Sequence, residues 1–415
     1  MLISVVGLGY IGLPTAALLA SRGMRVVGVD INPRVVETVN KGLIHIVEAD
    51  LDAVVYSTVG KGLLRAVTDP EPADVFVIAV PTPFRDGTPD ISYVEQAGHM
   101  IAPVLRAGNL VILESTSPVG TTEFLCRLLA ESRSDLKFPL AGASEVDVCV
   151  AYCPERVLPG KVLQELVEND RVIGGLTERC TERAIAFYRL FCEGECLPTS
   201  VRTAELCKLT ENAFRDVNIA FANELSLICD RLGIDVWALV RLANHHPRVN
   251  ILQPGPGVGG HCIAVDPWFI VSSAPEQARL IRTAREVNDS KPGIVLGKIR
   301  GFANELKSNG VPRPGIACLG LTFKADVDDI RESPALAISE EITRWGDCDV
   351  FVAEPHLKEL PGDLAGKNHV IMMSAPDAIA RAEIVTLLVN HRQFFEIERA
   401  SLANKKIVDT RGVWA

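Results

Sequence analysis

The chain has 415 residues, of which 48% are hydrophobic and 23% charged, and its formal net charge is −10. This length exceeds what one hydrophobic core ordinarily supports, so we expect two or three domains. The acidic balance argues against general nucleic-acid binding, although a few local Arg and Lys side chains could hold a small anionic ligand. The eleven cysteines lack paired C-x-x-C units, and neither a leader nor a membrane-spanning run stands out. We therefore expect no metal site, reduced thiols and a cytoplasmic location.

The first thirty residues carry a dinucleotide-binding pattern. A β-rich run at 2–6 leads into Gly7-Leu8-Gly9-Tyr10-Ile11-Gly12, and after a helical stretch a second strand at 25–29 ends at Asp30. In such a loop Gly7 permits a tight turn, Gly9 lets a pyrophosphate approach the backbone, and Gly12 allows the helix to pack closely on the strand. A carboxylate at Asp30 would accept both ribose hydroxyls, which favours NAD over NADP because a 2′-phosphate would meet a negative charge.

Further strands alternate with helical patterns in the first half of the chain. They are predicted at 74–80, 110–113 and 148–152. Thr82, Thr116 and Glu155 follow these strands, and the ligands of an open parallel sheet lie beyond the carboxyl ends of its strands. Each of the three residues is thus a candidate for ligand contact, with ordinary loop chemistry as the alternative.

A long helix is predicted at the centre of the chain. Residues 203–232 contain no Gly or Pro, and apolar residues recur there at three- and four-residue steps. The length favours a helix that joins two domains and also takes part in a dimer contact. Lys208 and Asn212 lie four residues apart and share one face, which is either solvated or directed into a ligand cleft.

The stretch Gly255-Pro256-Gly257-Val258-Gly259-Gly260 places four glycines within six residues, and Cys262 and Asp266 follow it. Backbone without side chains can approach a ligand closely. The alternative is a glycine-rich turn followed by a buried, inert thiol. Beyond this stretch, residues 278–287 are predicted to form a helix that Lys291-Pro292 breaks.

A second α/β unit is predicted after a proline-rich boundary at 312–314. A helix should open at Glu332-Ser333-Pro334. This half has no G-x-G-x-x-G, so it should resemble a dinucleotide fold without binding a whole dinucleotide. Its strands are predicted at 316–319, 350–353, 384–389 and 406–409.

A nicotinamide cofactor and a cysteine together suggest oxidation at the aldehyde level. A thiolate adds to an aldehyde carbonyl, hydride leaves to NAD, and the resulting thioester is hydrolysed. Because the thiolate is the nucleophile, a cation such as Lys208 near Cys262 would favour it and steady the oxyanion. Asp266 could position a water molecule or help to move a proton.

These motifs occur in the order seen in nucleotide-sugar 6-dehydrogenases, which the chain resembles over essentially its whole length. The resemblance implies an α/β fold with two Rossmann-like doubly wound domains joined by a long central helix and a helical middle domain. It also implies an NAD-binding domain at 1–198, a central dimerisation domain with the cysteine loop at 199–305, and a UDP-sugar-binding domain at 306–415. The matching segments are 7–12 with Asp30, 114–120, 153–160, 206–212, 257–266 and 320–331.

The resemblance also implies roles for individual residues. Cys262 would be the nucleophile, Lys208 would stabilise the carbonyl oxygen, and Glu155 would assist thioester hydrolysis. Water would be organised by Asp266, Asn212 and Thr116. Cofactor contacts are indicated for Gly7, Gly9, Tyr10, Ile11, Gly12, Asp30, Thr82, Thr116 and Arg331. Substrate contacts are indicated for Leu158, Pro159, Gly160, Lys208, Asn212, Arg248, Asn250, Gly257, Gly259, Lys324 and Arg411.

Within this family, four segments resemble the enzymes that act on UDP-N-acetyl-D-mannosamine. They are 44–48, 215–224, 246–252 and 255–269. This implies a two-step, NAD-dependent oxidation of the C6 alcohol of that sugar nucleotide, in a homodimer or larger oligomer that serves polysaccharide biosynthesis. The same chemistry on UDP-N-acetylglucosamine or UDP-glucose is the nearer alternative, since sugars that differ at C2 need local contacts that the sequence does not display. A simple two-electron alcohol or hydroxyacid dehydrogenase and an inactive sugar-nucleotide-binding protein are more distant alternatives.

Overall fold

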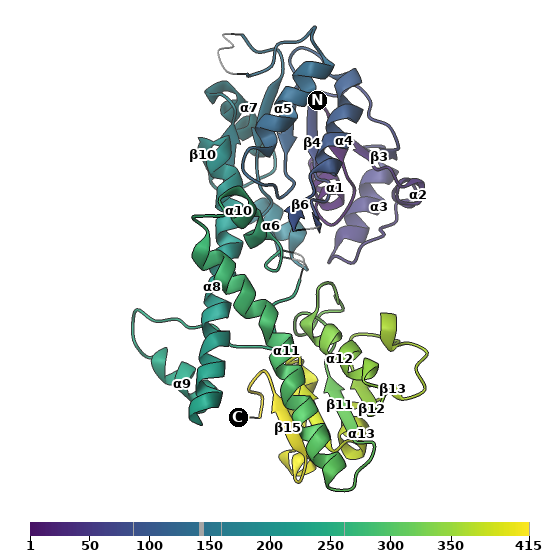
Figure 1. Ribbon diagram of the computed structural model, residues 1–415. Coiled ribbons are helices and arrows are strands. Elements are labelled where there is room, and N and C mark those ends of the chain that lie inside the picture. The colour runs from purple at the N-terminus through teal and green to yellow at the C-terminus, as the bar shows by residue number, and fades with distance from the viewer. Residues whose placement is uncertain (86, 141–144, 159, 261, 415) are drawn as a thin grey trace. The chain divides into compact units, whose positions relative to one another are not determined.

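The computed structural model describes residues 1–85, 87–140, 145–158, 160–260 and 262–414 (Figure 1). These residues form two compact units. The first comprises Met1–Glu211 and Trp268–Ala274, and the second comprises Asn212–Pro267 and Pro275–Ala415. Within the described ranges, no helix combines the length and the apolar character that crossing a membrane requires.

The first unit contains an eight-stranded sheet with the order β10-β9-β8-β7-β4-β1-β2-β3. Neighbouring strands are parallel, except that β8 and β9 are antiparallel. Strands β4, β7 and β8 are buried along their whole length, as expected for a sheet that is covered on both faces. The strands are β1 Leu2–Val6, β2 Arg25–Val29, β3 Leu64–Val67, β4 Val75–Ile78, β7 Leu110–Leu113, β8 Cys149–Tyr152, β9 Arg171–Gly175 and β10 Cys196–Ser200, beside a short hairpin of β5 Phe84–Arg85 and β6 Thr88–Pro89.

Helices cover both faces of this sheet and enclose two separate apolar cores. One face carries α1 (Gly12–Ser21), α3 (Leu51–Gly60), α6 (Val162–Glu168) and α7 (Glu178–Tyr188). The other face carries α4 (Ser92–Ile101), α5 (Thr121–Ser132) and the short η1 (Ala102–Val104), while α2 (Pro33–Asn40) packs beside β3. The predicted strand–helix–strand start of the chain and the doubly wound architecture are confirmed.

Two long helices dominate the middle of the chain. The predicted central helix is confirmed as α8 (Val201–Leu232), which begins in the first unit and ends in the second. In the second unit it lies beside the first half of α11 (Arg279–Ser308), which then slants away from it, and the two are joined by contacts such as Asp216 with Arg285 and Asp230 with Lys298 (Figure 1). The shorter helices here are α9 Val236–Ala243 and α10 Asp266–Ser273.

The prediction that Lys291-Pro292 breaks the helix begun near residue 278 is wrong. Helix α11 continues through Pro292 to Ser308. A proline inside a helix removes one backbone hydrogen bond and crowds the preceding turn. The residues beyond it offset this cost because Val295, Ile299 and Ala303 are buried in the core of the second sheet.

The second sheet is wholly parallel, with the order β13-β12-β11-β14-β15. Helices α11 and α12 (Pro334–Arg344) enclose one core, and α13 (Ala375–Arg381) with η3 (Arg392–Glu396) and η4 (Arg399–Leu402) encloses the other. The four predicted strands are confirmed, and Ser333 caps α12 as its sequence indicated. The strands are β11 Gly315–Leu319, β12 Asp349–Ala353, β13 Val370–Met372, β14 Ile384–Leu387 and β15 Lys406–Asp409, with η2 at Gly362–Leu364.

Candidate active site

The glycine loop between β1 and α1 has the geometry of a dinucleotide turn. Gly7 has a φ of +92°, and a Cβ there would lie 2.6 Å from the Ala79 carbonyl oxygen. A Cβ on Gly12 would lie 1.8 Å from the Gly7 carbonyl oxygen. A Cβ on Gly9 would meet no described atom within 4 Å. Protein packing therefore demands glycine at positions 7 and 12, whereas glycine at position 9 fits the close approach of a ligand.

Asp30 stands at the end of β2, beside this loop. Its Oδ2 accepts the Leu8 backbone N–H at 3.0 Å, and its Oδ1 accepts the Asn32 backbone N–H at 2.9 Å. The carboxylate therefore fixes the glycine loop, and each oxygen keeps a second lone pair for a ribose hydroxyl. Tyr10 and Ile11 lie in the turn before α1, with the Tyr10 side chain 45% exposed.

The loops after β4 and β7 are tied together. The Thr82 hydroxyl donates to the Thr116 carbonyl oxygen at 2.5 Å. The loop after β7 is also held by Glu205 of α8, whose carboxylate accepts the backbone N–H groups of Gly120 at 2.6 Å and Thr122 at 2.8 Å. Glu205 is fully buried, and this burial raises its pKa against the opposing effect of the hydrogen bonds. Sequence reasoning missed Glu205 because its partners lie 85 and 83 residues away in the chain.

Glu155 lies after β8 in a buried charge cluster. Its carboxylate pairs with Arg171 at 2.7 Å, and the Arg171 guanidinium lies 5.1 Å from the centre of the Tyr188 ring. The Tyr188 hydroxyl donates to Glu114 at 2.6 Å. Burial and the nearby Glu155 charge raise the pKa of Glu114 to about 7. Arg171 and Glu114, neither of which sequence reasoning selected, thus set the electrostatic surroundings of Glu155.

The backbone of Glu155 also holds a residue of α8. The Lys208 Nζ donates to the Glu155 carbonyl oxygen at 2.5 Å. The next loop is fixed by Glu48, whose carboxylate accepts the backbone N–H groups of Gly160 and Val162, both at 2.8 Å. Leu158 donates its N–H to Glu165, and Pro159 lies outside the described residues. The first unit therefore brings Lys208 onto the loop after β8, which continues to the predicted substrate contacts.

Asn212, one turn after Lys208, belongs to the second unit and has a different partner. Its Nδ2 donates to Asp266 Oδ2 at 2.6 Å, and both side chains are buried. Cys262 is exposed, and its carbonyl oxygen accepts the Asp266 N–H at 2.8 Å. The predicted thiol, acid and amide are thus linked through one turn that leads into α10. His261, next to the thiol, lies outside the described residues.

Helix α10, which follows the turn in the chain, is held by aromatic rings of the first unit. Trp268 and Phe269 of α10 both stack with Phe84, with ring centroids 6.2 Å apart in each case. Phe269 is fully buried. Aromatic side chains bury large areas with few rotamers, so α10 has a rigid hold in the first unit immediately after the cysteine turn.

The glycines that precede Cys262 pack against the C-terminal part of their own unit. A Cβ on Gly259 would lie 2.5 Å from the Glu332 carbonyl oxygen, and one on Gly257 would lie 3.0 Å from Pro334. A Cβ on Gly255 would lie 2.8 Å from the Arg411 guanidinium. The sequence suggested that these glycines expose backbone to a ligand. The structure adds a second reason for glycine here, because a larger residue would collide with the protein atoms packed against the loop.

The start of the glycine loop is fixed by a buried polar chain between α8 and α11. The Gly255 N–H donates to Asn223 Oδ1, Asn223 Nδ2 donates to Asn288 Oδ1, and Asn288 Nδ2 donates to Asp216 Oδ1, each at 2.8 Å. Arg285 ends the chain with a 2.6 Å contact to the same Asp216 oxygen. Asn223, Asn288 and Asp216 have no exposed surface, and Arg285 is 2% exposed.

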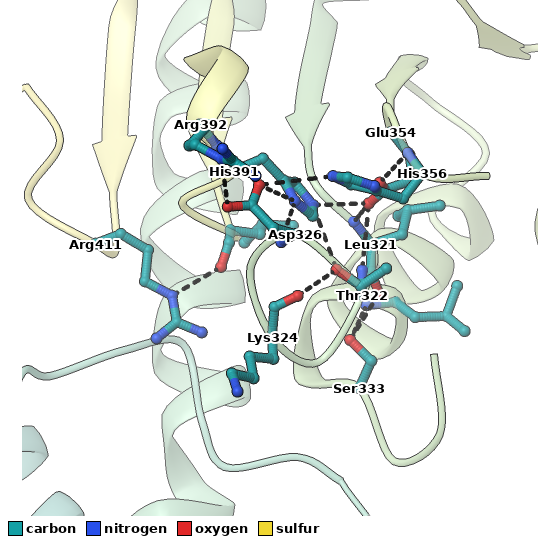
Figure 2. Close-up of polar contacts among 12 residues, drawn as sticks. Leu321, Thr322, Lys324, Asp326, Ser333, Glu354, His356, His391, Arg392 and Arg411 are labelled. Carbon is teal, nitrogen blue, oxygen red and sulfur yellow. Dashed lines mark hydrogen bonds and ion pairs between the residues drawn. The ribbon is translucent and has the colours of Figure 1, made fainter. Parts of the chain in front are cut away.

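The predicted nucleotide contacts of the second unit fall into two groups. Lys324 follows β11 and Arg411 follows β15, and in Figure 2 the Lys324 side chain points away from His356 and Glu354, toward the side on which Arg411 lies. Arg411 also donates to the Leu388 carbonyl oxygen at 3.1 Å. The second group is exposed: Arg248 and Asn250 lie beyond α9. Arg331 is ion-paired with Asp329 at 2.6 Å.

Comparison with known proteins identifies domains along the chain. Family models of the UDP-glucose/GDP-mannose dehydrogenase family match three successive regions: the NAD-binding domain at residues 1–192, the central domain at 202–290 and the UDP-binding domain at 317–415. Together they define an NAD-dependent oxidoreductase that acts on nucleotide sugars. The chain belongs to the UDP-glucose/GDP-mannose dehydrogenase family, as the sequence motifs predicted.

Similar proteins carry two different substrate names. The chain is 60% identical over 414 residues, 100% of its own length and 96% of the other protein, to an NDP-N-acetyl-D-galactosaminuronic acid dehydrogenase of Ralstonia nicotianae. It is 57% identical over 416 residues, 99% of each chain, to a UDP-N-acetyl-D-mannosamine dehydrogenase of Escherichia coli K12. Among solved structures, a UDP-D-ManNAc dehydrogenase of Pyrococcus horikoshii is similar with a TM-score of 0.87 and 38% identity, covering 100% of this chain and 96% of that one.

Proposed function

We propose that the protein oxidises the C6 alcohol of UDP-N-acetyl-D-mannosamine to UDP-N-acetyl-D-mannosaminuronate in two NAD-dependent steps. The observation that carries the proposal is the exposed Cys262 at the turn that leads to the buried Asn212–Asp266 pair, in a chain with an NAD-binding and a UDP-binding domain. The mannosamine relatives support this sugar, and the 60% identical galactosaminuronate relative makes the corresponding galacto sugar nucleotide the second candidate.

Cys262 is proposed to retain the intermediate on the protein. NAD, when bound, accepts one hydride in each oxidation. The Cys262 thiolate adds to the C6 aldehyde to give a thiohemiacetal, whose oxidation gives a thioester. Water attacks the thioester carbon, the C–S bond breaks, and the sugar acid and the thiol are released. Four electrons thus leave one carbon: two when the alcohol becomes the aldehyde, and two when the thiohemiacetal becomes the thioester.

The neighbouring polar groups are proposed to assist these steps. The ammonium of Lys208, held at the Glu155 carbonyl oxygen, would stabilise the oxyanion at C6. Asp266, oriented by Asn212, would organise the water with Thr116. Glu155 would assist hydrolysis from the end of β8, where Arg171 pairs with its carboxylate.

NAD is proposed to bind mainly at the first sheet, and the UDP part of the sugar nucleotide mainly at the second. NAD would contact the loop of Gly7, Gly9, Tyr10, Ile11 and Gly12 together with Asp30, Thr82, Thr116 and Arg331. The UDP-sugar would contact Leu158, Gly160, Gly257, Gly259, Lys324 and Arg411, with Arg248 and Asn250 as more distant contributors. The predicted domains at 1–198, 199–305 and 306–415 remain part of this proposal, as does a cytoplasmic location.

The ratio of NADH to sugar tests the reaction class. We expect two NADH per sugar nucleotide consumed, followed as absorbance with a limiting amount of each substrate, because the alcohol is taken to the acid. A ratio of one would contradict the proposal in favour of a simple two-electron dehydrogenase. A panel of the manno, galacto and gluco UDP-N-acetylhexosamines and UDP-glucose would rank the substrates by kcat/KM.

Helix α8 is proposed to form a homodimer contact. Phe214, Phe221 and Ile228 are spaced by seven residues and are 68%, 52% and 47% exposed, so they form one apolar stripe along the helix. The variant Phe221→Asp is expected to shift the protein toward the monomer in light scattering, because a charge would have to be buried in the contact. The matched control is Phe395→Asp, on a 59% exposed phenylalanine of η3. An unchanged mass for Phe221→Asp would contradict the assignment of the stripe.

A further inference from the structure

A buried polar cluster lies at the carboxyl edge of the second sheet (Figure 2). Glu354 follows β12 and is 4% exposed, and His391 lies four residues after β14 and has no exposed surface. Neither residue was selected by sequence reasoning, and neither has a role in the proposed chemistry. A buried carboxylate and imidazole are costly unless each polar atom finds a partner, so the partners indicate what the cluster does.

The Glu354 carboxylate collects donors from the segment that carries Lys324. Its Oε2 accepts the Leu321 N–H at 2.7 Å and the Thr322 N–H at 3.3 Å, and its Oε1 accepts the His356 N–H at 2.9 Å. Burial alone would raise the pKa of Glu354, but the hydrogen bonds from His391 and from the Leu321 backbone lower it overall. Glu354, as a charged hydrogen-bond acceptor, thus fixes the beginning of the segment 320–326.

His391 fixes the end of the same segment, at Asp326. Its Nδ1 accepts the Asp326 backbone N–H at 3.0 Å, so its ring proton lies on Nε2, which donates to Glu354 Oε2 at 3.1 Å. Asp326 has a φ of +60°, a backbone conformation that residues other than glycine rarely adopt. The His391 imidazole therefore connects the Glu354 carboxylate to the backbone N–H of Asp326, a residue with an unusual backbone conformation.

Lys324 lies between these two points of attachment. The Thr322 hydroxyl donates to the Lys324 carbonyl oxygen at 2.8 Å, which closes the segment on itself. The Lys324 side chain extends away from the cluster, toward the side of Arg411 (Figure 2). The backbone on both sides of Lys324 is thus held, while its ammonium is directed outward together with a second cation.

The same cluster offers three groups of a kind that bind metals. Asp326, His356 and His391 present one ligand atom each, all within 4.8 Å of one another. Both ring nitrogens of His391 are already engaged, however, and the Arg392 guanidinium lies 3.2 Å from the Asp326 carboxylate. A cation would have to displace these contacts, so the geometry favours a fixed backbone over a metal site.

We propose that Glu354 and His391 are positioning residues that fix Lys324 for the diphosphate of the UDP-sugar. This inference rests on the proposed function, because it takes a UDP-sugar as the ligand of Lys324. Lys carries a point charge on a flexible stem, and binding costs less ordering entropy when the backbone that carries the binding group is already held. Loss of the pair should therefore weaken binding of the sugar nucleotide and leave NAD binding unchanged.

Three substitutions of His391 dissect the pair. His391→Asn keeps an acceptor near the position of Nδ1, and His391→Gln keeps a donor near that of Nε2, whereas His391→Ala keeps neither. We expect His391→Ala to raise the Kd for UDP, measured by titration calorimetry, and the KM for the UDP-sugar by about tenfold or more. The Asn and Gln variants should fall between it and the unchanged protein. The KM for NAD should change less than about twofold in all three.

The matched control is His369→Gln in the same unit, where the imidazole contacts the Thr343 carbonyl oxygen at 3.1 Å. It should leave the Kd for UDP unchanged. If His391→Ala fails to fold, the Asn and Gln variants test the inference instead, provided that their melting temperatures stay near that of the wild-type protein. An unaltered Kd for UDP in these variants, or an equal rise in the KM for NAD, would overturn the inference. Failure of the unchanged protein to bind UDP would instead contradict the proposed function.

Discussion

Replacement of Cys262 by alanine is expected to abolish formation of the sugar acid, with kcat reduced by about a thousandfold or more. The reason is that the thiohemiacetal and the thioester both require this sulfur, and no other group is proposed to hold the aldehyde. The variant should still bind UDP and NAD, because Cys262 is not itself among the predicted nucleotide contacts and the change removes only its sulfur atom. Mass spectrometry of the products would check the loss of acid formation, and titration with UDP and with NAD would check that binding is retained.

The matched control for Cys262 is Cys207. Its thiol is half-buried on α8, and the remaining nine cysteines are buried. Cys207→Ala should leave the rate of acid formation within about twofold of the unchanged protein. Alkylation with iodoacetamide should likewise inactivate the unchanged protein at Cys262 first. Acid formation at an undiminished rate by Cys262→Ala would refute the assignment of the nucleophile.

The second large effect is expected on stability, from Arg285. The variant Arg285→Met should lower the free energy of unfolding by about 3 to 5 kcal/mol, because it leaves Asp216 buried without its cation. Burial already raises the pKa of Asp216, and Arg285 is the main group that opposes this effect. Urea unfolding followed by circular dichroism would measure the loss.

Two further variants test whether the buried charge is the cause. Asp289, the other partner of Arg285, is 52% exposed, so Asp289→Asn should cost less than about 1 kcal/mol. The double variant Asp216→Leu with Arg285→Met should recover much of the loss, since apolar pairs often replace buried ion pairs without penalty. A loss below about 1 kcal/mol for Arg285→Met alone would show that Asp216 does not depend on this cation.

The sequence predicts those parts of the site whose signals are local. The glycine loop at 7–12, the acid at Asp30 and the strands that precede Thr82 and Glu155 follow from spacing and periodicity alone. The common face of Lys208 and Asn212 is also local, but their separate partners, the Glu155 carbonyl and Asp266, depend on how distant loops return to α8.

The residues that the sequence did not predict share a physical reason. Glu48, Glu205 and Glu354 accept backbone N–H groups from loops that are 112, 85 and 33 residues away. Backbone donors leave no mark in the amino-acid sequence, so these carboxylates look like ordinary surface charges. The helix break predicted at Pro292 was wrong for a related reason, because the packing that keeps α11 continuous comes from strands of the second sheet that are distant in the sequence.

Two of these glutamates, Glu48 and Glu205, also restrict which mutations the protein can tolerate. A carboxylate presents two acceptor oxygens, whereas the amide of glutamine presents one acceptor and one donor. Exchange of Glu48 or Glu205 for glutamine, usually regarded as the mildest change, would direct an NH₂ group at a backbone N–H. Natural variation at these positions should therefore be limited to acids, although neither side chain touches a ligand in the proposed reaction.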